Sequence, residues 1–406
     1  MGVLAKERAR DRIAELARRG HDLVAFWQAC TEVLEAAVPH YDKPCWYTLD
    51  PASLLITSHY HDGLPEYPAK MLRHEYYDDD VNRVSDVARS ESGISTLHEA
   101  TGGDPSSSPS WHMNMAMGGD QEMIAAMRTG GAVWGAVGVY RAPGEPMFDD
   151  GDKAFLKAVG PDLATGARAG LLVGEARDPQ WPDSPGLVVL SEAGEVESTT
   201  PGVERWLADL PDGDLDAGRL PTAVHAVAGR ALRTAQGHDD PGQVALARVL
   251  SRSGTWIVLH GTSLVTSGSR RAAVIVEPAH PARITPLLMS AYGLTEREQE
   301  VTRLVLQGDS TVQIAQLLVV SPHTVQEHLK KIFEKTGVRS RRELVGKVFF
   351  AHYEPRFRDN EHRALEGDPL RGEPFPAEAA GSVAPAEGRE DHDRDGLRRG
   401  SGRSHP

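Results

Sequence analysis

The stretch from Pro322 to Thr336 gathers side chains with the chemistry of nucleic-acid binding. On a helical wheel, its apolar residues fall on one side and predict a buried face: Val325, Leu329, Ile332 and Phe333. The far side and its edges carry polar and charged groups: His323, Thr324, Gln326, Glu327, Lys330, Lys331 and Glu334. Such groups can bond base edges and phosphate oxygens. Between Pro322 and Lys347, four Lys and three Arg against three Glu give a net charge of +4, whereas the whole chain carries −14.

Four helix starts position this stretch. Each has a Ser or Thr that can cap the first free backbone N–H groups, and three also have a Glu or Gln three residues later, which is the capping-box pattern. The starts are Thr295 with Glu298, Ser310 with Gln313, Ser321 before Pro322, and Ser340 with Glu343. Gly308 and Gly337 are natural helix ends. Because only two or three residues separate the second helix from the third, the pattern predicts a helix-turn-helix arrangement.

The segment with these starts resembles the LuxR/GerE-type DNA-binding domain, with its register intact. The matching runs are Leu294-Thr295-Glu296-Arg297-Glu298, Ile314-Ala315, Ser321-Pro322-His323-Thr324-Val325, His328-Leu329, Ile332-Phe333-Glu334-Lys335 and Gly337-Val338-Arg339-Ser340-Arg341. The resemblance implies that the third helix enters the major groove of double-stranded DNA. It also implies that the fourth helix forms a homodimer contact, through Leu344, Val345, Val348 and Phe349.

The candidate DNA-binding set combines this resemblance with the polar face of the third helix. Lys330 stands where the family often has a DNA-contacting lysine, and the whole set is Ser321, His323, Thr324, Gln326, Glu327, Lys330 and Lys331. The chain departs from the family at Gln326, where many members have Lys or Arg, and at Glu327, where many have Asn or an apolar residue. A Gln favours adenine and a Glu can accept from cytosine, but the family's base preference cannot be carried over.

An alternative stays open because Glu327 and Glu334 lie on the face that would approach phosphates. Unpaired carboxylates are unfavourable there. The chain could instead be a protein-interaction antagonist or a scaffold, which keeps the module without specific DNA binding.

Two α+β segments precede the module. The first has entry helices, a hairpin around Thr129-Gly130-Gly131 and a closing helical pattern from Phe148 to Leu172, and it resembles a GAF-type sensor domain. The second has the order strand-strand-helix-helix-strand-strand-strand and resembles a PAS-like fold. These resemblances imply a small-molecule pocket or a dimerisation surface, without identifying pocket residues.

The expected fold is therefore multidomain, with five segments. They are a GAF-like α+β domain (1–176), a proline-rich linker (177–185), a PAS-like α+β domain (186–283), an all-α four-helix domain (288–352) and a disordered tail (353–406). The tail is rich in Gly, Pro and charged residues, so it cannot bury enough apolar surface to offset the entropy of ordering.

The sequence lacks the signals of several other classes of protein. There is no phosphate-binding P-loop and no recognisable catalytic set, so we expect neither an enzyme nor a cofactor. His59-Tyr60-His61-Asp62 lacks a clear third ligand for a metal. Cys30 and Cys45 are expected to be reduced thiols. With no apolar run of about 18 residues and a charged N-terminus, we expect a cytoplasmic protein without a membrane partner.

Overall fold

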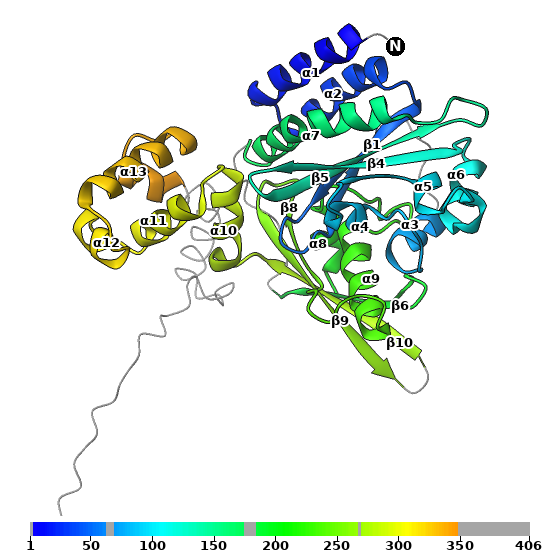
Figure 1. The fold of residues 1–406 in the computed structure, drawn as a ribbon. Coiled ribbons are helices and arrows are strands. Elements are labelled where there is room, and N and C mark those ends of the chain that lie inside the picture. Colours follow the sequence, from blue (N-terminus) through cyan, green and yellow to red (C-terminus); the bar gives the residue numbers. More distant parts are fainter. Residues whose placement is uncertain (1–2, 62–68, 174–183, 267–268, 348–406) are drawn as a thin grey trace, which may run out of the picture. The chain divides into compact units, whose positions relative to one another are not determined.

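The computed structural model describes residues 3–61, 69–173, 184–266 and 269–347. These residues form two five-stranded antiparallel sheets with their helices, followed by a group of short helices (Figure 1). The expected class, two α+β domains before an all-α region, is confirmed. Among the described helices, none combines the length and apolar composition needed to cross a bilayer. The tail and most of the proposed linker lie outside the described residues.

The first sheet has the strand order β2-β1-β5-β4-β3. Its strands are β1 (Tyr41–Leu49), β2 (Ile56–Tyr60), β3 (Ile94–Thr96), β4 (Gln121–Thr129) and β5 (Ala132–Arg141). The predicted hairpin is confirmed as β4 and β5. Gly130 and Gly131 both have positive φ, +60° and +79°, a backbone conformation that residues with a Cβ rarely adopt.

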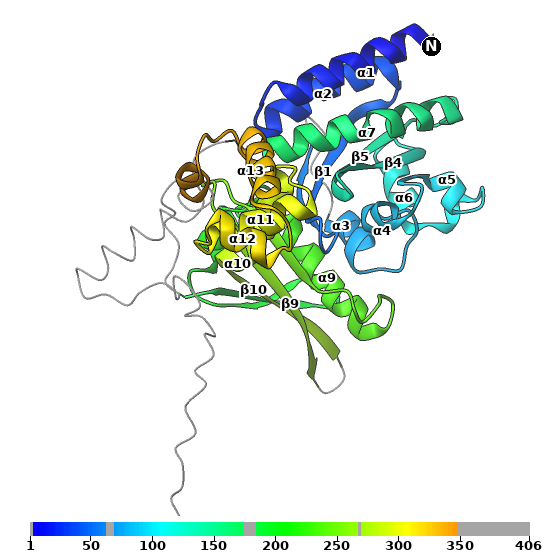
Figure 2. The ribbon, with the colours of Figure 1, turned by 60° about the vertical axis from the view of Figure 1, so that its left-hand side comes forward.

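Three long helices cover one face of this sheet (Figures 1 and 2). They are α1 (Val3–Arg18), α2 (Leu23–Ala37) and α7 (Asp150–Gly170). The helix α7 begins with a capping box between Asp149 and Asp152, and it buries Phe155, Leu156 and Val159 at helical spacing. The remaining helices are shorter: α3 (Ala69–Tyr76), α4 (Val84–Arg89), α5 (Leu97–Ala100), the 3₁₀ turn η1 (Pro105–Ser107) and α6 (Pro109–Ala116).

The second sheet repeats the strand order of the first, as β7-β6-β10-β9-β8. Its strands are β6 (Gly186–Ser191), β7 (Val196–Thr199), β8 (Leu246–Leu250), β9 (Trp256–Thr266) and β10 (Ser269–Pro278). Two helices follow its second strand, α8 (Val203–Ala208) and α9 (Thr222–Gln236). The helix α9 packs on β9 and β10 and also contacts β2 and α3 of the first domain.

The two sheet domains share their apolar cores. One cluster joins Trp27 and Trp46 of the first domain to Trp256 and Val258 of the second. The other joins Ile56 and its neighbours to the side chains of α9. This shared packing was not predicted, because the sequence indicated two domains separated by a linker.

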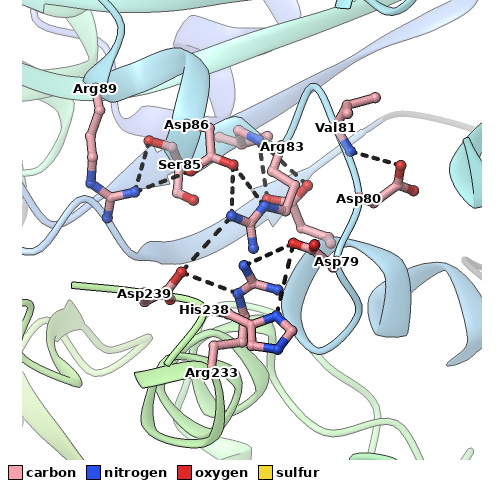
Figure 3. Close-up of polar contacts among 12 residues, drawn as sticks. Asp79, Asp80, Val81, Arg83, Ser85, Asp86, Arg89, Arg233, His238 and Asp239 are labelled. Atoms are coloured by element: carbon pink, nitrogen blue, oxygen red, sulfur yellow. Dashed lines mark hydrogen bonds and ion pairs between the residues drawn. The ribbon is translucent and has the colours of Figure 1, made fainter. Parts of the chain in front are cut away.

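Buried ion pairs reinforce the junction. The carboxylate of Asp50, in the β1–β2 turn, has no exposed side-chain surface and accepts bonds from the backbone N and the Nε of Arg248, at 2.9 and 2.8 Å. In a second cluster, Asp239 pairs with Arg230 at 3.0 Å and with Arg233 at 3.3 Å. Figure 3 shows how Arg83 of the first domain faces the same Asp239, at 4.0 Å.

The C-terminal helices are α10 (Pro281–Ala291), α11 (Glu296–Leu306), α12 (Thr311–Leu317) and α13 (Pro322–Thr336), with a further helical stretch at 341–347. The helix α10 crosses the proposed boundary region between 283 and 288. Its residues Ile284, Leu287 and Leu288 belong to the shared core, whereas Met289 belongs to the core of the module. The α10 helix is therefore a structural link between sheets and module.

Candidate nucleic-acid interface

The predicted capping boxes of α11 and α12 are confirmed, whereas at the fourth start Ser340 Oγ accepts from the N–H of Glu343 at 3.1 Å but Glu343 Oε2 accepts from the N–H of Arg339 instead of Ser340. Thr295 Oγ1 accepts from the N–H of Glu298 at 3.4 Å, and Glu298 Oε2 accepts from the N–H of Thr295 at 2.8 Å. Ser310 and Gln313 form the same reciprocal pair at 3.3 and 2.8 Å. These bonds satisfy backbone donors that have no partner inside a helix, so they fix where α11 and α12 begin.

A short turn connects α12 to α13. The N–H of Val320 donates to the carbonyl of Ala315 at 2.9 Å, which closes the end of α12, and Ser321 Oγ accepts from the N–H of Thr324 at 3.0 Å to start α13. Val319 lies between these caps with φ +54° and is 89% exposed. Gly337, with φ +68°, ends α13. This geometry defines a helix-turn-helix protein.

The apolar face of α13 forms the core of the module. Val325, Leu329 and Ile332 are buried, and Phe333 packs against them while partly exposed. Their partners come from the other helices: Val301, Val305, Ile314 and Leu344. The predicted buried face is therefore confirmed, and the polar face is left on the outside.

The candidate DNA-binding residues share that outer face. Those with exposed side chains are Ser321, His323, Gln326, Glu327, Lys330 and Lys331. Thr324 is half-buried, and its hydroxyl lies 2.8 Å from the hydroxyl of Ser321. Glu334 is also exposed on α13. The structure brings the predicted set together, while their contact with DNA stays a prediction.

The basic side chains between Pro322 and Lys347 divide into two groups. Lys335, Arg341 and Lys347 have structural partners: Lys335 Nζ bonds Glu298 at 2.6 Å, Arg341 bonds the carbonyl of Asp309, and Lys347 Nζ bonds the carbonyl of Thr336 at 2.7 Å. In the described residues, no side-chain hydrogen bond or ion pair engages the others, which are Lys330, Lys331, Arg339 and Arg342. The second group can therefore reach phosphates without breaking an internal contact.

The proposed dimer contact is only partly described. Leu344 is fully buried in the module's own core, so its apolar surface is already used within the chain. Val345 is 36% exposed. Val348 and Phe349 lie outside the described residues. Of the two described positions, Val345 is the one with surface available to a partner, and the dimer stays a prediction.

The structure also places the histidine and cysteine residues that were considered as metal ligands or thiols. In the part of the chain that the structure describes, no group of three or more His, Cys, Asp or Glu side chains is placed to hold a metal ion. His59 stacks on Tyr47 with ring centroids 4.9 Å apart. Cys30 and Cys45 are buried and are not joined by a disulfide.

Sequence analysis identified no pocket residues, but the first domain contains a polar cavity. It lies between the sheet and helices α3, α4 and α6, and its lining includes Glu75, Asn82, Asn114 and Glu122. A weak sequence signal existed, because Glu122 begins an otherwise apolar run, Met123 to Met127. Such an acid on a buried strand is unusual unless it has a partner.

Comparisons with known proteins address the module. Residues 293–348 match the family model described as bacterial regulatory proteins, luxR family. The spore germination protein GerE of Bacillus subtilis is 40% identical over 52 residues, 13% of this chain and 70% of that protein. A putative HTH-type transcriptional regulator of Mycobacterium bovis is 50% identical over 52 residues, 13% of this chain. The chain thus spans only 6% of the length of that mycobacterial relative.

The chain belongs to the luxR family of bacterial regulatory proteins through this module. For the sheet domains, one similar solved structure is the phycoerythrobilin-bound GAF domain from a cyanobacterial phytochrome, at 16% identity and a TM-score of 0.27, over 41% of this chain and 96% of that chain. A TM-score this low carries no argument about either domain. The α+β class of both domains rests on their own sheets, and the PAS-like assignment stays a prediction.

Proposed function

We propose that the chain is a DNA-binding transcription regulator in which α13 enters the major groove. The observation that carries this proposal is the exposed polar face of α13 within a module that matches the luxR family over residues 293–348. Several curated relatives with the same module are named as transcriptional regulators, including the transcriptional regulatory protein DesR of Bacillus subtilis, 38% identical over 65 residues, 16% of this chain and 33% of that protein.

The exposed groups of α13 and of the residues that follow it offer both kinds of DNA contact. Lys330, Lys331, Arg339 and Arg342 supply positive charge that can neutralise phosphates and fix the position of the helix. Among the remaining candidates, Gln326 has the donor–acceptor pair that matches adenine, and a carboxylate such as Glu327 can accept from the amino group of cytosine. Phosphate contacts would supply affinity, and base-edge contacts would supply sequence preference.

Regulation in this proposal comes from the sheet domains. They would change dimerisation or the exposure of α13 in response to a small ligand or a protein partner. The helix α10 would transmit this change from the sheet domains to the module, since its residues take part in the shared core and in the core of the module. A homodimer would present two copies of α13 to two half-sites about one helical turn of DNA apart.

The first test is binding of the purified full-length protein to fragments of its own genome at about 150 mM salt, followed by sequencing of the retained fragments. Enrichment of a few sites, each with two half-sites, is the expected result. Retention without any enriched sequence would contradict specific recognition. A complete lack of retention, with and without candidate ligands, would favour the alternative of a protein-interaction antagonist, which Glu327 and Glu334 on the outer face keep open.

The Lys330→Ala variant tests the assignment of the face. Loss of one phosphate contact should weaken binding to all sequences and reduce the slope of log K against log salt by about 0.9 for each monomer bound. Lys157→Ala is the matched control, because it removes the same charge from an exposed position on α7. An unchanged slope for Lys330→Ala would show that Lys330 does not contact a phosphate.

A further inference from the structure

The cavity of the first domain has a volume of about 60 Å³. Its walls include the rings of Tyr47, Tyr76 and Tyr140, the carboxyl groups of Glu75 and Glu122, and the carboxamide of Asn114. Since about 10 to 15 Å³ suffices for one water molecule, this space takes four or more water-sized groups. A compact organic molecule of about six non-hydrogen atoms is of matching size.

Polar groups in this wall lack partners. Asn114 is only 2% exposed, yet neither its Nδ2 nor its Oδ1 has a hydrogen-bond partner. Asn82 is 8% exposed; its Nδ2 donates to Glu122 Oε2 at 3.2 Å, but its Oδ1 is unsatisfied. An unsatisfied buried polar group costs about 1 to 3 kcal/mol. Two carboxamides on one cavity therefore indicate a site built for a hydrogen-bonding ligand.

The two carboxyl groups give the site its charge preference. Burial raises the pKa of Glu122 to about 7 and raises the pKa of Glu75 well above its ordinary value. A carboxyl group in such surroundings ionises readily only when a cation comes close. The cavity thus presents acids that a positively charged ligand would convert to carboxylates.

The charged groups of the protein around Glu122 do not provide that cation. Arg83 directs its Nε to Asp86 Oδ2 at 2.7 Å (Figure 3), and burial lowers the pKa of His59 to about 3, which leaves His59 neutral. Asp80 adds a further negative charge, bonded to the hydroxyl of Ser108 and the N–H of Ser110 at 2.8 and 2.9 Å. The remaining titratable groups in the lining are Glu75, His74 and the three tyrosines.

We propose that this cavity binds a small primary ammonium compound that also carries a hydrogen-bond acceptor, such as an amino amide. The ammonium group has three donors, which match the carboxylates of Glu122 and Glu75 and the Oδ1 of Asn82. Asn114 Nδ2 donates to the acceptor of the ligand. Aromatic rings attract an ammonium ion that lies over their face, so the tyrosines add to the same selectivity.

Other ligand classes fit the wall less well. A carboxylate or phosphate would meet two acids and Asp80, while the one arginine of the lining, Arg83, is already paired with Asp86. A hydrocarbon would leave both carboxamides unsatisfied. A role of this site in regulating DNA binding rests on the proposed function. Its output would pass through Arg83, which lines the cavity and faces Asp239 of the second domain at 4.0 Å (Figure 3).

The test is isothermal titration calorimetry of the full-length protein without DNA. The probe is β-alaninamide, an ammonium compound with an amide acceptor, and the comparison ligands are butyramide, its neutral isostere, and butyrate. At pH 8, β-alaninamide should bind at least tenfold more tightly than either. Because binding requires ionised Glu122, with a pKa of about 7, its affinity should fall about tenfold between pH 8 and pH 6.

Two variants separate the charge of the site from its shape. Glu122→Gln should reduce the preference for β-alaninamide over butyramide at least fivefold and flatten the pH dependence. Glu99→Gln is the matched control, because it removes one carboxylate from an exposed position on α5 of the same domain and should leave the preference unchanged. Asn114→Ala should weaken both amides by a similar factor, since it removes the donor to the amide carbonyl.

Equal affinity of the wild type for β-alaninamide and butyramide would overturn the proposal. So would a lack of saturable β-alaninamide binding up to about 50 mM, a range that covers weak binding by so small a ligand. Because this titration contains no DNA, it is independent of the proposed function. Amine binding with no enriched DNA site would contradict only the transcriptional role. Enriched DNA sites without amine binding would contradict only the ligand assignment.

Discussion

The two sheets have the same strand order but different material between their second and third strands. In the second domain, α9 fills this connection and buries twelve of its residues, among them Val224, Val227 and Leu232. In the first domain, the short helices α3 and α4 occupy the corresponding connection, and a polar cavity lies beside them. The two domains thus share a strand order but differ in the helices between the strands, and the short helices of the first domain line the polar cavity together with Thr222 of α9.

The comparison assigns different roles to similar domains. The second domain contributes packing and ion pairs, since its α9 contacts β9 and β10 of its own sheet and β2 of the other. The first domain contributes the cavity, whose wall holds the unsatisfied Oδ1 of Asn82 and the unsatisfied carboxamide of Asn114. We infer that the first domain binds the ligand and that the second domain stabilises the fold. Three variants test this division.

The largest expected effect comes from breaking the junction at Asp50. Asp50→Ala leaves Arg248, whose side chain is only 11% exposed, without its carboxylate, and should lower the free energy of unfolding by about 3 to 5 kcal/mol. Urea unfolding measures it. The control, Glu35→Ala, breaks a half-exposed pair with Lys43 and should cost less than about 1 kcal/mol. Similar small losses for both variants would show that the domains do not depend on this pair.

The second variant, Glu122→Gln, addresses the first domain and is stabilising at high pH. The pKa of Glu122 rises from 4.5 in the unfolded chain to about 7 on folding, so the folded state binds the extra proton between these values. The free energy of unfolding of the wild type therefore falls as pH rises through this window, by up to about 3 kcal/mol. The variant does not lose this stability, because its glutamine does not titrate. Urea unfolding at pH 5 and pH 8 should show similar stabilities at pH 5 and a more stable variant at pH 8. A variant that is less stable at pH 8 would contradict the burial of Glu122 without a cationic partner.

The smallest effect concerns the contact of α9 with the first domain. A Cβ at Gly229 would lie 2.3 Å from the backbone carbonyl oxygen of Tyr76, so Gly229→Ala must push the two domains apart and should cost about 2 kcal/mol. Gly160→Ala on α7 is the control, because its Cβ would meet the nearest oxygen, of Ala126, at 3.4 Å. That change should be neutral or gain up to about 1 kcal/mol from helix propensity. Thermal unfolding of both variants decides whether close approach at Gly229 matters.

Local signals explain which parts could be predicted from the sequence. The helices of the module begin at side chains that bond backbone groups three residues away, as Ser310 and Gln313 do, and such pairs are visible in a sequence. The same holds for the hairpin at Gly130 and Gly131. The polar face of α13 followed from helical spacing alone.

Long-range contacts explain what could not be predicted. The bond between Asn82 and Glu122 joins residues 40 positions apart, and Asp50 meets Arg248 at a separation of 198. No periodic pattern records such pairs, so the sequence indicated neither the cavity nor the shared core. The burial of Leu344 likewise depends on how the fourth helical stretch packs against the others.

The position of α10 sets the terms for building hybrid regulators. A fusion that exchanges only the first sheet domain would strip apolar cover from Trp256 and Val258, which pack with Trp27 and Trp46. The transplantable unit is therefore the stretch from 3 to 291, both sheets and α10 together. A joint placed at Gly293, just before the cap of α11, would let these sheet domains be combined with the C-terminal helices of another family member.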